Sequence, residues 1–311
     1  MDRPFLFVDA KNVAYRCFVP EETFSTKDGT RTDLMHIGFK ILSKLARDHQ
    51  PRRVYLIWDN GPAWWRRVVH EGYKVKVLDE YMSGTKQEIE AQTPGAKEFF
   101  EKFGMINVEA PGEEADDIIA KMVDQHAPCL IVSSDSDFYQ LVSDSVHIYN
   151  PRKHETITPE WVLENEGVPP CQYAAVKAVV GDTSDVITGI KGVGWKTALK
   201  LWQPAVGPEV TDLTEMLSLF HASLQTAEGK RARDILTGWA TVKRNLALIH
   251  MGIYPETPGI VTAMNDAMKA VPTFQREGAI AALKKYEMIQ LLADINTWVP
   301  VFRNLPDVQE V

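Results

Sequence analysis

Residues 105–137, MINVEAPGEEADDIIAKMVDQHAPCLIVSSDSD, show the pattern on which the fold class depends. Short apolar runs predict one strand over 105–110 and another over 129–135. Between them, residues 113–126 have the apolar spacing of an amphipathic helix. A strand, a helix and a second strand in this order join two parallel strands of one sheet.

The same alternation continues on both sides of this unit. Further strands are predicted at 5–8 (FLFV), 53–59 (RVYLIWD) and 146–150 (VHIYN), and a further helix at 37–48 (IGFKILSKLARD). Thr93 and Pro94 fit the N-cap and the first position of a helix that carries three phenylalanines. We therefore expect an α/β fold, with a mostly parallel central sheet flanked by helices.

Two regions depart from this alternation. Residues 72–92 (GYKVKVLDEYMSGTKQEIEAQ) mix charge and glycine without a strong apolar stripe, and are too long for an ordinary connection. We expect a loop there, with at most a short helix. From about residue 156 helical patterns replace the strands, so we expect an α/β part over 1–155 and a helical part over 156–311.

Composition bounds the protein class. Of the 311 residues, 45% are hydrophobic and 24% are charged, which excludes collagen-like and disordered chains. No apolar run is long enough to span a membrane, and the short apolar N-terminal segment ends in charge, unlike a signal peptide. The three cysteines, Cys17, Cys129 and Cys171, indicate neither a disulfide framework nor a zinc site. We expect a cytoplasmic protein.

Acidic residues stand where the predicted strands end. Asp9 and Asp59 each end a strand, and Asp135 ends another, with Asp137 two residues later. Because the carboxyl ends of parallel strands share one edge of a sheet, we expect these side chains to meet there. A single Asp after a strand is also a common helix cap or turn residue, so each position has a structural alternative.

Three more acids, Glu114, Asp116 and Asp117, occupy the first turn of the helix predicted at 113–126. The helix dipole alone favours acids at such a place. However, so many carboxylates at one edge repel each other unless cations intervene, and the hard ions Mg²⁺ and Mn²⁺ prefer all-oxygen sites. The joint placement of the acids favours a metal site over separate structural roles.

The segment 179–202, VVGDTSDVITGIKGVGWKTALKLW, adds Asp182 and Asp185 and a glycine-rich turn. The glycines at 189, 192 and 194 separate two helical patterns, as in helix–hairpin–helix motifs. Small residues let the backbone approach a phosphate, and N–H groups at the next helix start can receive it. Lys196 and Thr197 add a charge and a hydroxyl. The alternative is a glycine-rich helix C-cap.

Over residues 4–204 the chain resembles the 5′ nucleases, or flap endonucleases, which include the nuclease domain of bacterial DNA polymerase I and free-standing bacteriophage enzymes. FLFVDAKNVAYR is similar to the family's first strand, metal-binding Asp9 and Arg16, and IWDN to the second Asp, Asp59. WWRRVVHEGYK resembles the entrance to the family's helical arch, here expected at about 72–92. Val186 departs from the pattern, because an Asn often follows the second Asp of GDTSD.

The resemblance implies a PIN-like nuclease core, an arch segment and a helix–three-turn–helix at about 182–204. It also implies two Mg²⁺ ions, for which Mn²⁺ can substitute, and a K⁺ ion at the helix–three-turn–helix. The implied metal ligands are Asp9, Asp59, Glu114, Asp116, Asp117, Asp135, Asp137, Asp182 and Asp185. The implied catalytic residues are Lys74, Arg66 and Arg16, and the implied DNA-binding residues are Tyr73, Gly189, Lys191, Gly192, Gly194, Lys196 and Thr197.

The expected division of ligands places Glu114, Asp116, Asp135 and Asp137 at one ion. Asp182 and Asp185 mainly bind the other, with Asp137 close to both, and Asp9, Asp59 and Asp117 act through water. The net charge of −8 is consistent with a nucleic-acid partner, because 33 acids remain against 34 bases once these nine are set aside.

The function implied is a structure-specific 5′ nuclease, with flap endonuclease and 5′-3′ exonuclease activity. Its partners are DNA with a 5′ flap, nick or 5′ end, and RNA–DNA hybrid during primer removal in replication. No membrane partner is implied, and the enzyme is expected to be monomeric and most similar to the bacteriophage members. The alternatives are a PIN-type endoribonuclease, a non-catalytic DNA-binding relative and a metal-dependent phosphatase.

Overall fold

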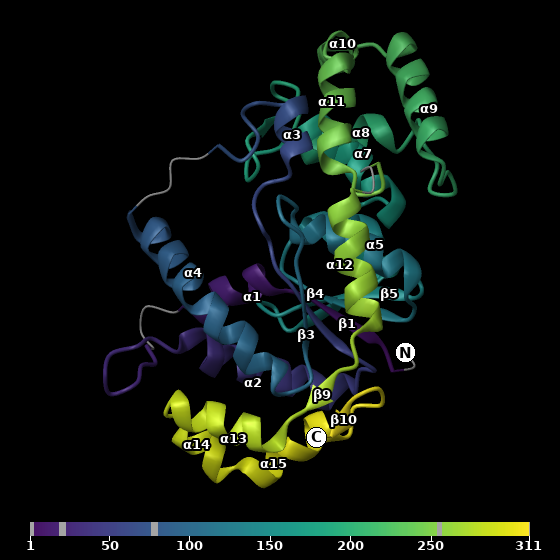
Figure 1. The fold of residues 1–311 in the computed structure, drawn as a ribbon. Coiled ribbons are helices and arrows are strands. Elements are labelled where there is room, and N and C mark those ends of the chain that lie inside the picture. The colour runs from purple at the N-terminus through teal and green to yellow at the C-terminus, as the bar shows by residue number, and fades with distance from the viewer. Residues whose placement is uncertain (1–2, 19–22, 76–79, 254–256, 311) are drawn as a thin grey trace.

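The computed structural model describes residues 3–18, 23–75, 80–253 and 257–310 (Figure 1). Its centre is a six-stranded sheet with the order β3-β2-β1-β4-β5-β6. The strands are β1 (Phe5–Asp9), β2 (Val54–Ile57), β3 (Ile106–Val108), β4 (Cys129–Val132), β5 (Val146–Asn150) and β6 (Glu155–Ile157). The first five are parallel and β6 is antiparallel to β5, which confirms the predicted α/β class.

Successive residues of a strand point to opposite faces of the sheet, and here both sets are apolar. Helices therefore cover both faces. Leu6 and Val8 of β1 pack in one core cluster with α1 (Ala10–Cys17), α2 (Asp33–His49) and α4 (Glu80–Glu101). Phe7, between them, packs in a second cluster with α5 (Ala115–Gln125) and α12 (Pro258–Lys269). The result is a three-layer sandwich whose central strands β1, β2 and β4 are almost completely buried.

A third cluster forms the core of a helical lobe at the top of Figure 1. Its main helices are α7 (Pro170–Val180), α8 (Trp195–Trp202), α9 (Leu213–Thr226), α10 (Lys230–Thr237) and α11 (Trp239–Ile249). The short elements β7 (Gly181–Asp182) and β8 (Ile187–Thr188) pair as an antiparallel hairpin between α7 and α8. The C-terminal part of the chain is thus helical, as predicted.

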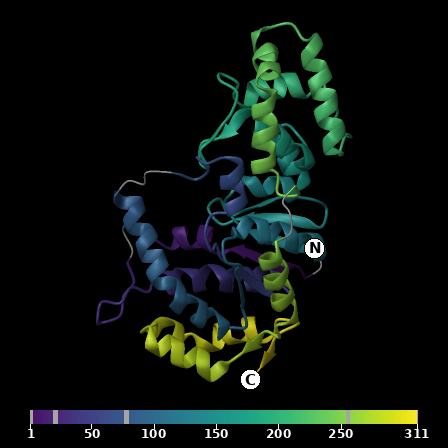
Figure 2. The same cartoon turned by 45° about the horizontal axis from the view of Figure 1, so that its top comes forward.

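The end of the chain returns to the sandwich. Helix α12 leads from the helical lobe along the sheet, and the last helices lie at the opposite end of the molecule (Figures 1 and 2). There Trp298 packs against Phe39 of α2, with 5.5 Å between ring centroids. The remaining elements are α3 (Trp64–Val69), a 3-10 helix η1 (Ser136–Leu141), α6 (Pro159–Glu166), α13 (Arg276–Lys285), α14 (Ile289–Ala293), α15 (Ile295–Arg303), β9 (Thr273–Phe274) and β10 (Gln309–Glu310).

The prediction for the arch region is wrong in part. Helix α4 begins at Glu80, so most of the expected 72–92 loop is helical, while residues 76–79 lie outside the described residues. The helix does not start at Thr93 and Pro94, because Pro94 lies inside it and the Thr93 hydroxyl donates to the Ile89 carbonyl at 2.7 Å. Packing of the apolar face of α4 on α2 overrides the local start signal.

The prediction that strands end near residue 155 is also wrong. Strand β6 spans that position and completes the sheet, and short pairs form at β7–β8 and β9–β10. Moreover, the C-terminal helices share a core cluster with α2 and α4 of the first half. The division into two domains at residue 155 stays a prediction. No helix in the described ranges has the length and apolarity needed to cross a membrane.

Candidate metal centre

The acidic residues gather at the carboxyl edge of the sheet, beside the neighbouring strands β1 and β4. The chain reverses its direction of strand addition between these two strands, and such a switch point leaves a crevice at the edge of a parallel sheet. Asp9 is the last residue of β1, and Asp135 follows β4 by three residues. Both belong to the predicted metal ligands.

Local backbone contacts fix the orientation of these acids. Asp9 is the N-cap of α1 and accepts from the Asn12 N–H at 3.1 Å, while Asp135 caps η1 and accepts from the Asp137 N–H at 2.9 Å. Asp59 accepts from the N–H of Ala115 at the start of α5, at 3.0 Å. Each carboxylate is thus held at one oxygen by a helix start. The same contacts that satisfy the helix starts therefore orient these three carboxylates.

Sequence reasoning missed three polar residues that join β1 to β4. The Ser133 hydroxyl donates to Asp9 Oδ2 at 2.9 Å, and the Asn12 side-chain oxygen accepts from the Ser134 N–H and hydroxyl at 3.0 and 2.9 Å. Only their position next to the strand-end acids marks them in the sequence. They fix the distance between the two strand ends that carry the site.

A tight acidic cluster lies where the sandwich meets the helical lobe. One carboxylate oxygen from each of Asp137, Asp182 and Asp185 lies within 4.8 Å of the others. Lys177 of α7 forms ion pairs with Asp137 and, at 2.6 Å, with Asp182. Sequence reasoning missed Lys177, although it stands five residues before Asp182. Packing of α7 on η1 brings it to the acids.

Arg66 lies beneath the site instead of on its surface. Its side chain is only 4% exposed and forms a bidentate pair with Asp117, at 2.6 and 2.7 Å, and a further bond to Glu114 at 2.8 Å. A fourth bond reaches the Leu248 carbonyl at 3.0 Å. These partners turn the guanidinium away from solvent, so it does not present itself to a phosphate as the resemblance implies.

Tyr73 and Lys74 connect the two groups of acids. The Tyr73 hydroxyl donates to Glu114 at 2.9 Å and to Asp185 at 3.3 Å, and the ring is 2% exposed. Tyr73 is therefore buried at the site and does not offer a free surface for DNA. Lys74 Nζ lies 3.0 Å from Glu114 and 3.8 Å from Asp185, with 31% of its side chain exposed.

Two residues of this region have left-handed backbone conformations that favour glycine or asparagine. Lys74 has φ +53° and Val186 has φ +61°. For Val186, whose side chain is β-branched, this conformation is unusual and strained. An Asn, which the resemblance leads us to expect at position 186, would adopt this conformation more readily than Val. The Val186 carbonyl is also within 3.2 Å of His70 Nε2, and the Lys74 N–H donates to the Asp185 carbonyl at 3.0 Å.

Burial and mutual repulsion perturb the titration of the acids. Burial, with a smaller contribution from Asp59, raises the pKa of Asp9 to about 7. Burial raises the pKa of Asp137 to about 7 although Lys177 opposes the shift, and it raises that of Asp116 well above its usual value. Burial also acts on Glu114, but Lys74 and Arg66 outweigh it and lower the pKa. Ionising the whole cluster therefore needs additional positive charge.

The residues present fit divalent cations. Nine carboxylates face four basic side chains, those of Lys11, Arg66, Lys74 and Lys177. Within the described ranges no ion pair joins Asp9, Asp116 or Asp135 to a basic group. An oxygen-only donor set with this excess of negative charge suits Mg²⁺ or Mn²⁺.

The glycine turn lies next to this centre, between β8 and α8. Gly189 packs so closely that an added Cβ would lie 1.9 Å from the Val180 carbonyl oxygen, and Gly192 has φ +73°. Gly194 is the N-cap of α8, with Lys196 and Thr197 in the first turn. Lys191 and Lys196 are exposed. The DNA-binding role of the residues of this turn stays a prediction.

Arg16 has no contact with the acids among the ion pairs and hydrogen bonds of the described residues given above. It lies in the last turn of α1, seven residues after Asp9, which corresponds to about 10 Å along a helix axis. Its role stays a prediction.

Comparison with known proteins supports this description. Residues 4–167 match the family model described as the 5′-3′ exonuclease N-terminal resolvase-like domain. DNA polymerase I of Thermus thermophilus is 34% identical over 200 residues, which cover 63% of this chain and 23% of that protein. DNA polymerase I of Mycobacterium tuberculosis is 35% identical over 253 residues, 78% of this chain and 26% of that protein. The chain spans about a quarter of the length of these relatives.

Solved structures share the fold. The bacteriophage T5 flap endonuclease, in a complex with DNA and metal ions, is 18% identical with a TM-score of 0.69, covering 86% of this chain and 98% of that one. The Holliday junction-resolving enzyme GEN1, in complex with product DNA and Mg²⁺, is 15% identical with a TM-score of 0.61, covering 98% of this chain and 73% of that one. At these identities the likeness is one of fold.

Proposed function

This chain belongs to the 5′-3′ exonuclease family, and we propose that it is a metal-dependent nuclease that hydrolyses phosphodiester bonds near the 5′ ends of DNA. The observation that carries the proposal is the convergence of Asp137, Asp182 and Asp185 within 4.8 Å, beside the Asp9–Asp135 edge of the sheet. The Ser133 hydroxyl contacts both Asp9, at 2.9 Å, and the Asp135 N–H, at 3.1 Å.

Two Mg²⁺ ions are the proposed cofactors, and Mn²⁺ is the proposed substitute. Asp137, Asp182 and Asp185 would hold one ion, and Asp9, Asp116 and Asp135 lie at the other side of the cluster, with Asp59 next to them. Bound divalent ions supply Lewis-acid activation of water and stabilisation of the leaving oxygen. Both carboxylate oxygens of Asp117 accept from Arg66. We therefore assign Asp117 a positioning role through Glu114 and the start of α5.

The basic residues divide into two roles. Lys74 is the one we propose to contact the scissile phosphate, because 31% of its side chain is exposed while its ammonium lies next to Glu114. Arg66 instead positions Glu114 and Asp117 from below, since its bonds to these two acids and to the Leu248 carbonyl lie inside the fold. Tyr73 holds Glu114 and Asp185 at a fixed separation.

The glycine turn is the proposed grip on the duplex beside the cleavage site. Exposed Lys191 and Lys196 and the backbone around Gly192 and Gly194 suit phosphate oxygens and do not read sequence. A K⁺ ion between turn carbonyls and a phosphate is part of this proposal. So are 5′-flap, nicked and RNA-primed substrates, a monomeric state, a site of action in the bacterial or phage-infected cytoplasm and a bacteriophage-type role in replication.

Product mapping tests the proposed function. A duplex with a labelled 5′ flap is incubated with the protein and Mg²⁺, with a nicked duplex, an RNA-primed duplex and a single-stranded RNA in parallel. We expect cleavage near the flap junction that EDTA abolishes. Cleavage of the single-stranded RNA in preference to every duplex would indicate a PIN-type ribonuclease instead. No turnover on any of them would indicate a DNA-binding protein without catalysis.

A further inference from the structure

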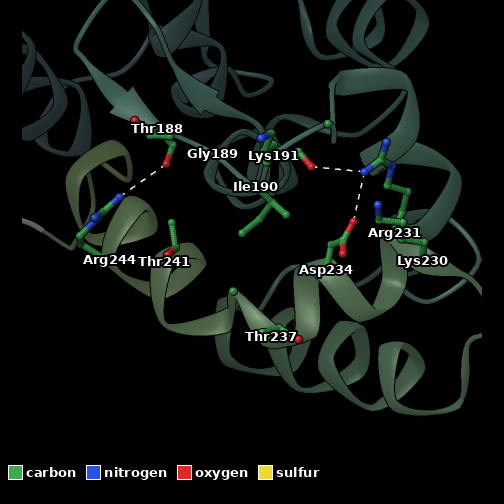
Figure 3. Close-up of a pocket in the computed structure, with 12 residues that line it drawn as sticks. Thr188, Gly189, Ile190, Lys191, Lys230, Arg231, Asp234, Thr237, Thr241 and Arg244 are labelled. Atoms are coloured by element: carbon green, nitrogen blue, oxygen red, sulfur yellow. Dashed lines mark hydrogen bonds and ion pairs between the residues drawn. The ribbon is translucent and has the colours of Figure 1, made fainter.

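A basic cavity of about 780 Å³ lies beside the glycine turn, between residues 188–192 and the helix pair α10–α11 (Figure 3). Lys191 contributes from the turn, Lys230 and Arg231 from the start of α10, and Arg244 from α11. The acidic member of its lining is Asp234. This local excess of positive charge contrasts with the net charge of −8 of the whole chain.

The two arginines lie on opposite sides of the turn and are held in place by it (Figure 3). Arg231 Nη1 donates to the Lys191 carbonyl at 3.4 Å and pairs with Asp234 at 3.1 Å. Arg244 Nη2 donates to the Thr188 carbonyl at 3.5 Å and to Asn245 Oδ1 at 2.9 Å. A guanidinium has five N–H donors, so both retain donors for a ligand.

The close fit between the turn and α10 supports a built cavity. A Cβ at Gly192 would lie 2.8 Å from the Arg231 guanidinium, so glycine at this position allows the arginine to approach the turn. The buried Asn245 amide also donates to the carbonyls of Ala178 and Thr188, both at 3.0 Å, which fixes α11 against α7 and the turn. Lys230 and Arg231 are the first residues of α10, where the helix dipole adds positive charge.

We propose that this cavity binds phosphodiester groups of the duplex, so that α10 and α11 form a second wall opposite the glycine turn. The cations and the hydroxyl of Thr241 are the donors that phosphate oxygens accept from. Its cations come from the turn and from two helices, a spread that suits a continuous backbone more than an isolated ion. The inference rests on the proposed function and adds a site outside the segment matched by the family model.

The test compares two double variants that remove the same charge from the same two helices. Lys230→Ala with Arg244→Ala removes cations that line the cavity. Arg233→Ala with Lys243→Ala removes exposed cations of α10 and α11 that do not line it. Binding of a plain duplex without a flap is measured in Ca²⁺ over a range of salt concentrations.

We expect the cavity variant to lose about tenfold in duplex affinity and about two units of the slope of log affinity against log salt, while the control stays within about twofold of wild type. Equal affinities and slopes in the two variants overturn the inference. Lys230→Glu alone is a further arm, because Lys230 is exposed on the first turn and its replacement should leave folding intact; an unchanged duplex affinity there also overturns it.

Inorganic phosphate distinguishes a backbone site from a small-anion site. Calorimetric binding of phosphate that disappears in the cavity variant, with duplex affinity unchanged, would overturn the assignment to DNA. Failure of the proposed nuclease function would show separately, as absent flap cleavage by the wild-type protein with Mg²⁺, whatever the duplex affinities are.

Discussion

Lys177 Nζ lies 2.6 Å from Asp182 Oδ2, and the same ammonium contacts Asp137. A lysine thus lies between two of the three carboxylates that converge most closely. It supplies one positive charge where two acids need compensation, and the lysine is only 12% exposed. In the absence of a divalent ion, Lys177 stabilises the acidic cluster. A divalent ion bound among these acids would repel the Lys177 ammonium.

Replacing Lys177 with Met should therefore have opposite effects on stability and on metal binding. We expect a lower melting temperature in EDTA, because Asp137 and Asp182 lose their partner, and a several-fold tighter Mn²⁺ affinity by electron paramagnetic resonance titration. Lys200→Met, an exposed lysine on α8, is the control. An unchanged Mn²⁺ affinity in Lys177→Met would show that the ammonium does not compete with the metal.

Asp135→Asn should separate binding from hydrolysis. Asparagine caps helices as well as aspartate does, so η1 should persist, while the site loses one negative charge. We expect flap affinity in Ca²⁺ within about threefold of wild type and a single-turnover rate lower by orders of magnitude. Asp144→Asn, in an exposed loop, is the matched control. Near-normal turnover of Asp135→Asn would remove this residue from the mechanism.

Lys74→Ala should slow cleavage more than it weakens binding. The proposed contact of its ammonium is with charge that develops on the phosphate, and such a contact acts mainly on the transition state. Single-turnover rates and flap dissociation constants are measured for this variant and for Arg67→Ala, an exposed basic residue of α3. If both variants keep the wild-type rate, Lys74 does not have the proposed role.

Arg66→Met should mainly lower the free energy of unfolding. The change leaves Asp117 buried without its bidentate partner, and breaking such a pair typically costs about 3–5 kcal/mol. Urea unfolding of Arg66→Met and of the double variant Arg66→Met with Asp117→Leu measures this cost. We expect the double variant to recover much of it. A loss below about 1 kcal/mol in the single variant would argue against the buried pair.

The pH dependence of the stability of the metal-free protein follows from the raised pKa values of Asp9 and Asp137. Burial raises their pKa values from 3.8 to about 7, so between these values the folded protein holds protons that the unfolded chain has released. The stability that the two groups contribute is thus full below about pH 4 and is lost as the pH rises towards 7 in the metal-free protein. Divalent cations favour the ionised forms, so Mg²⁺ binding at about pH 6 should release protons.

Calorimetry in two buffers of different ionisation enthalpy measures this release. Equal apparent enthalpies in the two buffers would mean that no proton leaves, and would contradict the assignment of these acids to the metal centre.

The positions of the acids in the fold were easier to predict from the sequence than the groups with which they pair. Asp9 ends β1, and Asp59 and Asp135 follow the ends of β2 and β4 by two and three residues. The carboxyl ends of parallel strands meet at one edge of a sheet whatever the rest of the chain does. The ion pairs of Lys177 depend on how α7 packs on η1, which no local pattern encodes. The burial of Arg66 likewise depends on the Leu248 carbonyl, 182 residues away.

Long-range packing also accounts for the errors in the fold. Pro94 carries a strong local signal for a helix start, yet the apolar face of α4 continues through it onto α2. The contact of Trp298 with Phe39 joins residues from opposite ends of the chain, so local periodicity did not reveal that the last helices return to the sandwich.

The most direct test of the metal centre is an anomalous difference map from crystals grown with Mn²⁺. The account predicts two peaks, roughly 4 Å apart, within coordination distance of Asp137, Asp182 and Asp185 on one side and of Asp135 on the other. A well-ordered map with no peak among these carboxylates would contradict it.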